Sequence, residues 1–269
     1  MTSSNKKKLL NGIIAAAMLL LAGTAYVAWE RAQAQNNYER LSEHRADQLV
    51  QEASAALPPP ASSETDPTGS AEGSSSSESS YVYKENINKK WLDINPDFMG
   101  WLQIPGTNID YPFVRSKDNQ DYLKRDFNGN YSEAGTLFMD YRNLGNFNDP
   151  HTLIYGHNMK NKSMFQNLTY YQDLDFFSQN QHIQLSGLFE TRTYKIFSVY
   201  EISADDYVFT LHFENDTEYL TYLNGLEDLS LHRQDLILET GQRLLTLVTC
   251  SYGVNNGRTI VHAVEVSEE

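Results

Sequence analysis

A run of uncharged residues near the N-terminus is the feature that most constrains this chain. Residues 9–29 carry no charged side chain, and three lysines at 6–8 precede them directly. As a helix, these 21 residues extend about 31 Å, enough to cross the hydrocarbon core of a bilayer. The lysines on one side, and charges that cancel on the other, predict that residues 1–8 stay in the cytoplasm. We therefore expect a single-pass protein of the cell membrane whose remaining chain is extracellular.

A cleaved signal peptide is the alternative interpretation of the same run. Ala32 and Ala34 have the small side chains of a cleavage site. The apolar run is long for a signal peptide, however, and Ala32 lies beyond its end, so we favour an uncleaved membrane anchor. Both interpretations export the rest of the chain.

Residues 30–80 are polar and predict a stalk. Within residues 30–57, apolar side chains recur at roughly helical spacing, which indicates a weak amphipathic helix (Tyr38, Leu41, Leu49, Ala53 and Leu57). Three prolines at 58–60 end it. Residues 61–80 are mostly Ser, Glu, Gly, Thr and Ala, too polar to bury a core, and we interpret them as a flexible spacer.

From residue 81 the composition changes, and the pattern becomes that of a mainly β domain over residues 81–269. Turn residues separate eight β-type runs, and three segments have helical patterns. This predicts a closed or nearly closed eight-stranded barrel with an N-terminal helix and helical insertions. The runs are residues 100–104, 109–114, 135–140, 152–156, 182–188, 191–203, 243–249 and 259–266, and the helices are residues 86–95, 163–176 and 216–226.

The charge of the chain is negative, with a formal value of −14, and residues 81–269 hold 15 Lys and Arg against 26 Asp and Glu. An acidic balance argues against nucleic acid as a partner, because phosphate binding requires clustered basic side chains. The sequence contains no 12-residue calcium loop and predicts no metal or other cofactor.

Cys250 is the single cysteine, which excludes intramolecular disulfides and cysteine-based zinc sites. It ends the apolar run 244–249 and precedes a glycine-containing turn. A buried cysteine that acts as a small hydrophobic residue is one interpretation. Because a free thiol is unusual in an exported protein, and because strand ends open onto rims, the other is a catalytic nucleophile.

A thiol nucleophile needs a base and a group that stabilises the oxyanion. Of seven histidines, His157 is the best placed, since Gly156 and Asn158 mark the end of a strand there. Arg258 opens the last strand, and a hairpin over residues 251–257 would bring it beside Cys250, where a guanidinium could stabilise negative charge. A solvated surface arginine is the alternative for Arg258.

Together these pieces resemble the sortase family of cysteine transpeptidases, and class B in particular. Residues 246–250 read Thr-Leu-Val-Thr-Cys, the family's nucleophile motif, with Arg258 after it and His157 before it. The class B likeness rests on three further stretches and covers residues 81–266. They are Asn-Pro-Asp-Phe-Met-Gly-Trp-Leu at 95–102, Ile-Asp-Tyr-Pro at 109–112, and Gly-His-Asn-Met at 156–159 followed by Ser-Met-Phe at 163–165.

The resemblance implies that Cys250 attacks the threonine carbonyl of a sorting motif near the C-terminus of a secreted protein or pilin. His157 would exchange protons with the departing and incoming amines, and Arg258 would hold the motif and the oxyanion. An amine of a peptidoglycan precursor or of a pilin would release the thioacyl intermediate. A thiol peptidase that hydrolyses its substrate, and a non-catalytic extracellular adhesion or interaction barrel, remain alternatives.

The resemblance also implies residues that contact the substrate. Asn119 and Leu123 match groove-lining positions of class B, and Thr249 would offer its hydroxyl beside the nucleophile. Tyr222 and Leu223 lie in the helical insertion that would cover the groove. Ordinary core residues of an amphipathic helix are the alternative for these last two.

Overall fold

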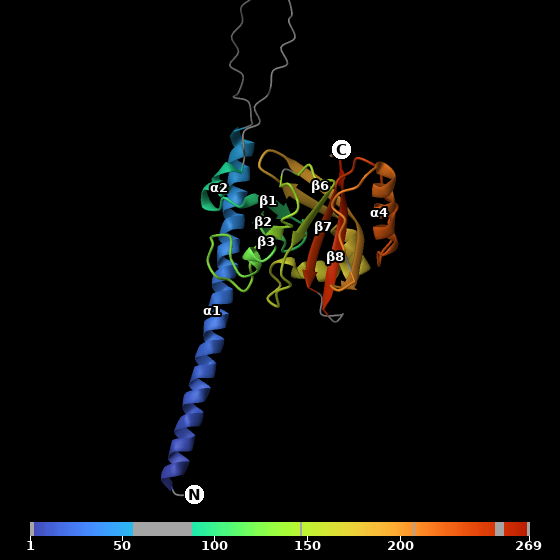
Figure 1. Cartoon of the computed structure of the whole chain (residues 1–269). Coiled ribbons are helices and arrows are strands. Elements are labelled where there is room, and N and C mark those ends of the chain that lie inside the picture. Colours follow the sequence, from blue (N-terminus) through green and yellow to red (C-terminus); the bar gives the residue numbers. More distant parts are fainter. Residues whose placement is uncertain (1–2, 56–87, 146, 207, 251–255, 268–269) are drawn as a thin grey trace, which may run out of the picture.

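A closed barrel of eight strands forms the body of the protein, as the sequence predicts (Figure 1). The computed structural model describes residues 3–55, 88–145, 147–206, 208–250 and 256–267. The strands follow one another around the barrel in the order β1-β2-β3-β4-β7-β8-β6-β5. They are β1 (Phe98–Gln103), β2 (Asp110–Val114), β3 (Leu137–Met139), β4 (His151–Tyr155), β5 (His182–Ser186), β6 (Thr191–Ser203), β7 (Leu244–Cys250) and β8 (Gly257–Val266).

Two of the strand pairs are parallel, β2 with β3 and β4 with β7. In the second pair, Tyr155 at the end of β4 lies beside Val248 near the end of β7. The carboxyl ends of both strands therefore open onto the same rim of the barrel. On the other side of β7, the antiparallel strand β8 begins at this rim.

The helical segments lie outside the barrel wall and mostly match the predicted positions. The predicted helix at 163–176 is a 3-10 helix followed by a short α-helix, and the spacer at 61–80 lies outside the described residues. The segments are α1 (Ser3–Ala55), α2 (Lys89–Ile94), η1 (Asp121–Leu123), η2 (Phe165–Gln172), α3 (Leu174–Gln179) and α4 (Asp216–Asp228).

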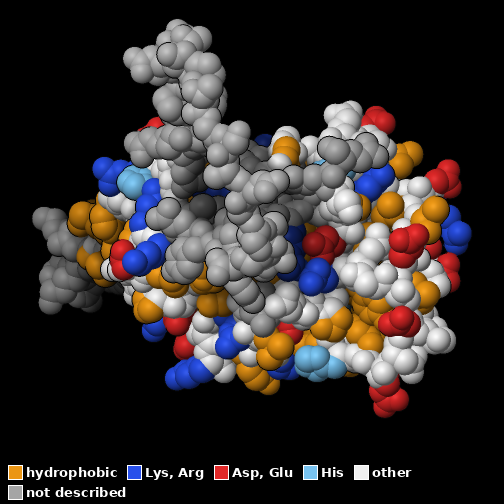
Figure 2. Space-filling model, turned by 90° about the horizontal axis from the view of Figure 1, so that it is seen from above, with side chains coloured by type: hydrophobic (Ala, Val, Ile, Leu, Met, Phe, Trp, Pro, Cys, Tyr) orange, Lys and Arg blue, Asp and Glu red, His pale blue; other side chains and the backbone are white. Residues whose placement is uncertain are grey.

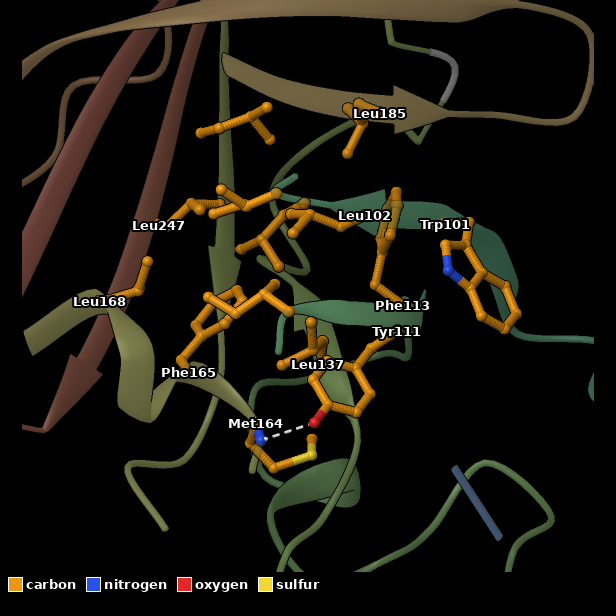
Figure 3. Packing of buried hydrophobic residues seen from close by; sticks show 14 of the residues in the cluster. Trp101, Leu102, Tyr111, Phe113, Leu137, Met164, Phe165, Leu168, Leu185 and Leu247 are labelled. Carbon is orange, nitrogen blue, oxygen red and sulfur yellow. Dashed lines mark hydrogen bonds between the residues drawn. The ribbon is translucent and has the colours of Figure 1, made fainter. Parts of the chain in front are cut away.

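Apolar side chains from the strands fill the barrel, and Figure 3 shows how those from β1, β2, β3, β5 and β7 meet there. Trp101, Phe113 and Leu247 are all completely buried. One polar contact fastens a loop to this core: the backbone N–H of Met164 donates to the hydroxyl of Tyr111 at 3.2 Å. The core thus extends directly beneath the segment that follows β4.

The first half of α1 projects away from the barrel, and residues 13–29 are exposed (Figure 1). An 18-residue window in this helix has a mean hydropathy of 1.7, so the helix is long and apolar enough to cross a membrane. The second half lies along the barrel. The Tyr38 hydroxyl donates to the carbonyl of Gly135, and Arg45 forms an ion pair of 3.1 Å with Asp110. Residues assigned from the sequence to the stalk therefore pack on the folded body.

Tyr38→Ala should lower the free energy of unfolding by about 3 kcal/mol, the loss typical of deleting a buried aromatic ring. Tyr38 is 4% exposed and packs edge-on against Tyr111. Urea unfolding of the detergent-solubilised full chain, followed by tryptophan fluorescence, measures the change. Arg40→Ala on the exposed face of the same helix is the control, and equal midpoints for the two variants would contradict the docking.

A chain of hydrogen bonds lies on the outer face of the sheet. His151 donates from Nδ1 to the carbonyl of Thr210 at 2.6 Å, so its Nε2 accepts from the Thr246 hydroxyl at 2.7 Å. Thr246 Oγ1 in turn accepts from Nδ1 of His262 at 2.6 Å, and Nε2 of His262 accepts from the Tyr200 hydroxyl at 3.0 Å. With both imidazoles neutral, the carbonyl of Thr210 thus sets which atom donates and which accepts in each of these hydrogen bonds.

The stability of the protein should fall as the pH drops from about 6.5 towards 4. Burial lowers the pKa of His151 to about 4 and lowers the pKa of His262 as well. An unfolded histidine has a pKa of about 6.5, so below that pH the unfolded chain binds more protons than the folded one. Urea midpoints measured between pH 7 and 5 test this. His262→Gln should flatten the slope, whereas the exposed His182→Gln should leave it unchanged.

Candidate active site

A pocket of about 330 Å³ lies at the rim where β4 and β7 end. It brings together five of the residues singled out in the sequence: Asn119, Leu123, His157, Thr249 and Arg258. Gly156 and Val248, which belong to the quoted motifs, also line it, and the sequence did not point to the remaining lining residues, which are Gln120, Phe138 and Tyr155. We call this site the rim pocket.

His157 is held at both its backbone and its ring. Its carbonyl accepts from the backbone N–H of Phe165 at 2.9 Å, and its Nε2 lies 2.7 Å from the carbonyl oxygen of Leu123. A carbonyl can only accept, so Nε2 carries the hydrogen and donates it. In the neutral ring, Nδ1 is then the nitrogen that can take up a proton, which is what a general base requires.

Gly156 sets the turn that presents His157. A β-carbon at this position would lie 2.4 Å from Cδ2 of Leu137 and 2.7 Å from Cδ2 of Phe165, so only glycine fits between them. The N–H of Gly156 also donates to the carbonyl of Val248 at 3.1 Å. The segment that carries His157 is therefore attached to the same strand that ends at Cys250.

Cys250 is the last residue of β7 and pairs across the sheet with Arg258 of β8. Its backbone directly follows Thr249, which lines the rim pocket. The guanidinium of Arg258 donates to the carbonyls of Gly257 at 2.9 Å and Asn256 at 3.3 Å. Both acceptors are neutral, so these bonds orient the guanidinium without neutralising its charge. The described geometry thus places Arg258 next to the backbone of the predicted nucleophile.

The hydroxyl of Thr249 is buried near the end of β7. The residue is 2% exposed, and its Oγ1 has no hydrogen-bond partner among the residues that the structure describes. A buried hydroxyl left unpaired costs about 1–3 kcal/mol. Because Thr249 lines the rim pocket, a bound molecule could supply the missing partner.

One wall of the rim pocket is the loop that contains η1. The amide nitrogen of Asn119 donates to Asp140 at 3.1 Å, and its amide oxygen accepts from the backbone N–H of Tyr141 at 3.0 Å. At the other end of this loop, Leu123 provides the carbonyl that accepts from His157. Asn119 and Leu123, both expected to contact a substrate, are therefore held in place by hydrogen bonds to neighbouring residues.

Tyr222 and Leu223 do not line the rim pocket, contrary to the expectation from the resemblance. Leu223 is completely buried in a cluster with Phe197 and Tyr219, where it packs α4 against the sheet. The ring of Tyr222 lies 5.9 Å from that of His151. The amphipathic character of α4 explains both positions, because one face of such a helix must cover the sheet.

The described residues contain no group of three or more His, Cys, Asp or Glu that could hold a metal ion. The polar side chains that line the rim pocket carry an imidazole, a guanidinium, two amides and two hydroxyls. This set can bind a peptide backbone and move a proton, and it places a positive charge where an oxyanion could form.

Gly156→Ala should destabilise the fold by about 1–3 kcal/mol, because the added methyl group overpacks the site. The clash with Leu137 and Phe165 should also displace His157 from the carbonyl of Leu123. Thermal unfolding measures the first effect, and the ¹⁵N chemical shifts of the His157 imidazole measure the second. Gly225→Ala is the control, since no atom lies within 4 Å of a β-carbon there and its backbone is not in the left-handed region. A stability loss without any change in the His157 shifts would contradict this role of Gly156.

Comparison with known proteins gives consistent results. The model of the sortase domain matches residues 102–266. Sortase B of Listeria monocytogenes is 38% identical over 157 residues, which are 58% of this chain and 64% of that protein. Sortase B of Staphylococcus aureus is 32% identical over 173 residues, which are 63% of this chain and 70% of that protein.

Solved structures show the same likeness. Sortase B of Clostridium perfringens is 38% identical, with a TM-score of 0.64 over 67% of this chain and all of that one. A complex of Staphylococcus aureus sortase B with a substrate is 26% identical, with a TM-score of 0.71 over 89% of this chain and 99% of that one. The second match is long enough to include part of α1 as well as the barrel.

Proposed function

The chain belongs to the sortase family, its relatives are sortases of class B, and we propose that it is a membrane-anchored cysteine transpeptidase. In this proposal it cleaves a C-terminal sorting motif of a secreted protein or pilin after threonine. It then transfers the new carboxyl end to an amine of a peptidoglycan precursor or of a pilin. The observation that carries the proposal is the rim pocket, which gathers His157, Thr249 and Arg258 around the end of β7, where Cys250 lies.

The chemistry begins when the sulfur of Cys250 attacks the threonine carbonyl and its proton passes to Nδ1 of His157. Arg258 stabilises the negative charge that develops on the carbonyl oxygen. The imidazolium then donates its proton to the departing amine, and the C–N bond breaks to leave a thioester on Cys250. The bond from Nε2 to the Leu123 carbonyl supports this sequence, because it keeps Nδ1 available for both transfers.

The second half of the reaction reverses these roles. An incoming amine attacks the thioester while Nδ1 of His157 removes its proton. The new amide bond forms as the C–S bond breaks, and the imidazolium returns its proton to the sulfur of Cys250. Transfer prevails over hydrolysis only when the amine outcompetes water for the thioester.

The location follows from the anchor. We propose that residues 9–29 span the cell membrane once, with the N-terminus inside and the barrel outside. Acidic side chains gather mainly on the side of the barrel that carries α4, on the right of the view in Figure 2. Such an acidic surface repels the phosphates of nucleic acid and supports the solubility of a domain next to an envelope.

Incubation of the detergent-solubilised full chain with a library of C-terminal sorting peptides, with and without amine acceptors, tests the function. Mass spectrometry should detect peptides joined to the amine in wild type and none in Cys250→Ala, while the two proteins melt at the same temperature. Hydrolysis that an amine leaves unchanged would favour the thiol peptidase. Peptide binding without any turnover would favour the interaction module.

Arg258→Lys should lower kcat/KM by about 10²-fold, because lysine lacks the planar, multiply donating guanidinium that can stabilise an oxyanion. The rate of peptide turnover at equal protein concentration measures this. Arg233→Lys is the matched control, since the side chain of Arg233 is 81% exposed and pairs only loosely with Asp228 at 3.5 Å. Equal activity of the two variants would contradict a catalytic role for Arg258.

A further inference from the structure

Asp140 directly follows β3 and is a completely buried carboxylate with five hydrogen-bond donors around it. Its Oδ1 accepts from the backbone N–H of Arg142 at 3.0 Å and from Nε of Arg142 at 2.8 Å. Its Oδ2 accepts from Nη2 of Arg142 at 2.9 Å, from the Tyr155 hydroxyl at 2.9 Å and from Nδ2 of Asn119 at 3.1 Å.

The carboxylate of Asp140 is ionised in this setting. Burial acts to raise its pKa, but the hydrogen bonds from Arg142 and Tyr155, together with the charge of Arg142, outweigh burial and lower the pKa overall. Arg142 alone supplies a bidentate partner for the charge. The hydrogen bonds from Asn119 and Tyr155 are therefore not needed to compensate the charge. Their effect is to hold two residues of the rim pocket against the same carboxylate.

For Asn119, this contact settles which way the amide faces. One N–H of Nδ2 goes to Asp140, and the amide oxygen accepts from the N–H of Tyr141, so a flipped amide would lose both bonds. The second N–H of Nδ2 is then left to donate to a bound peptide in the rim pocket, which Asn119 lines.

For Tyr155, the contact anchors the end of β4. Its ring stacks on that of Phe138 with centroids 5.3 Å apart, and its hydroxyl is held by Asp140. His157 follows two residues later and donates to Leu123, in the same loop that Asn119 opens. Asp140 is therefore linked to His157 in two ways. One path is the hydrogen bond to Asn119 and the loop that ends at Leu123, and the other is the hydrogen bond to Tyr155 at the end of β4.

We propose that Asp140 is a positioning residue for the transpeptidation. It holds Asn119 and Tyr155 so that the wall of the rim pocket is preformed for the sorting peptide, without itself contacting the substrate. The inference rests on the proposed function of the same site and adds a residue that the sequence motifs do not point to.

Asp140→Asn, tested in the detergent-solubilised full chain, removes the charge at almost unchanged volume. It also replaces one acceptor oxygen by an NH₂ group, which faces hydrogen-bond donors. The KM for the sorting peptide that wild type turns over fastest should rise about tenfold, the effect of about 1.4 kcal/mol, while the KM for the amine acceptor stays the same. Asp149→Asn is the matched control. Asp149 is also buried, at 1% exposed, and accepts from the N–H of Leu144 at 2.8 Å, but it does not line the rim pocket.

Two further variants separate positioning from stability. Tyr155→Phe keeps the pair of Asp140 and Arg142 and should still raise the peptide KM, even if Asp140→Asn fails to fold. In an Asn119→Ala background, Asp140→Asn should raise the KM by clearly less than tenfold, because only the contact with Tyr155 remains to be lost and residues acting through one contact are not additive. An unchanged peptide KM in Tyr155→Phe, or full additivity in the double variant, overturns the proposal.

Hydrogen exchange of the Tyr141 amide tests the positioning without any substrate. Its N–H donates to Asn119, so Asp140→Asn should speed its exchange, whereas Asp149→Asn should not. If wild type joins no peptide to an amine, the proposed function fails. A Tyr141 amide that is equally protected in wild type and in Asp140→Asn overturns the positioning itself.

Discussion

The parallel pairing of β4 with β7 is the interaction on which the rest of the structure depends. Their register runs from His151 beside Leu244 to Tyr155 beside Val248, and both strands end at the same rim. Parallel neighbours cannot be joined by a tight turn and require a long connection. Here the intervening chain supplies β5, β6 and the helices that cover the sheet. The pairing therefore builds the barrel and brings two segments that are distant in sequence to one pocket.

Location within the same sheet separates a histidine available for chemistry from histidines that serve structure. His151 and His262 lie under cover, and both nitrogens of each ring have a hydrogen-bond partner. Burial holds them neutral, so the fold loses stability once the pH falls below about 6.5, where an unfolded histidine begins to take up a proton. His157 lies at the rim with one nitrogen committed to Leu123. A histidine side chain thus has a structural role where it is buried, as at 151 and 262, and is available for proton transfer where it lines a pocket, as at 157.

The sequence predicts the features that depend on residues close together in the chain, and not those that depend on contacts between distant residues. Strands such as β6, predicted at 191–203 and found there, show in alternating apolar residues and bounding turns. The helix α4 was also predictable, but the role of its residues was not: Leu223 packs in the core, because a helix face that covers a sheet reads like one that covers a groove. The hydrogen bonds at Asp140 and the packing of Tyr38 on the barrel join residues far apart in sequence, and no local pattern marks such contacts.

By itself, the sequence determined the order of the elements, the apolar segment at 9–29 and the residue types needed for thiol chemistry, because periodicity, hydropathy and motifs are local properties. Only the tertiary structure decided that His157 and Arg258 share a pocket, that the buried hydroxyl of Thr249 has no partner among the described residues, and that Nδ1 is the imidazole nitrogen left to exchange protons. These properties depend on which carbonyl or side chain stands opposite in space. Barrel closure sets those neighbours, and no segment of the chain carries them alone.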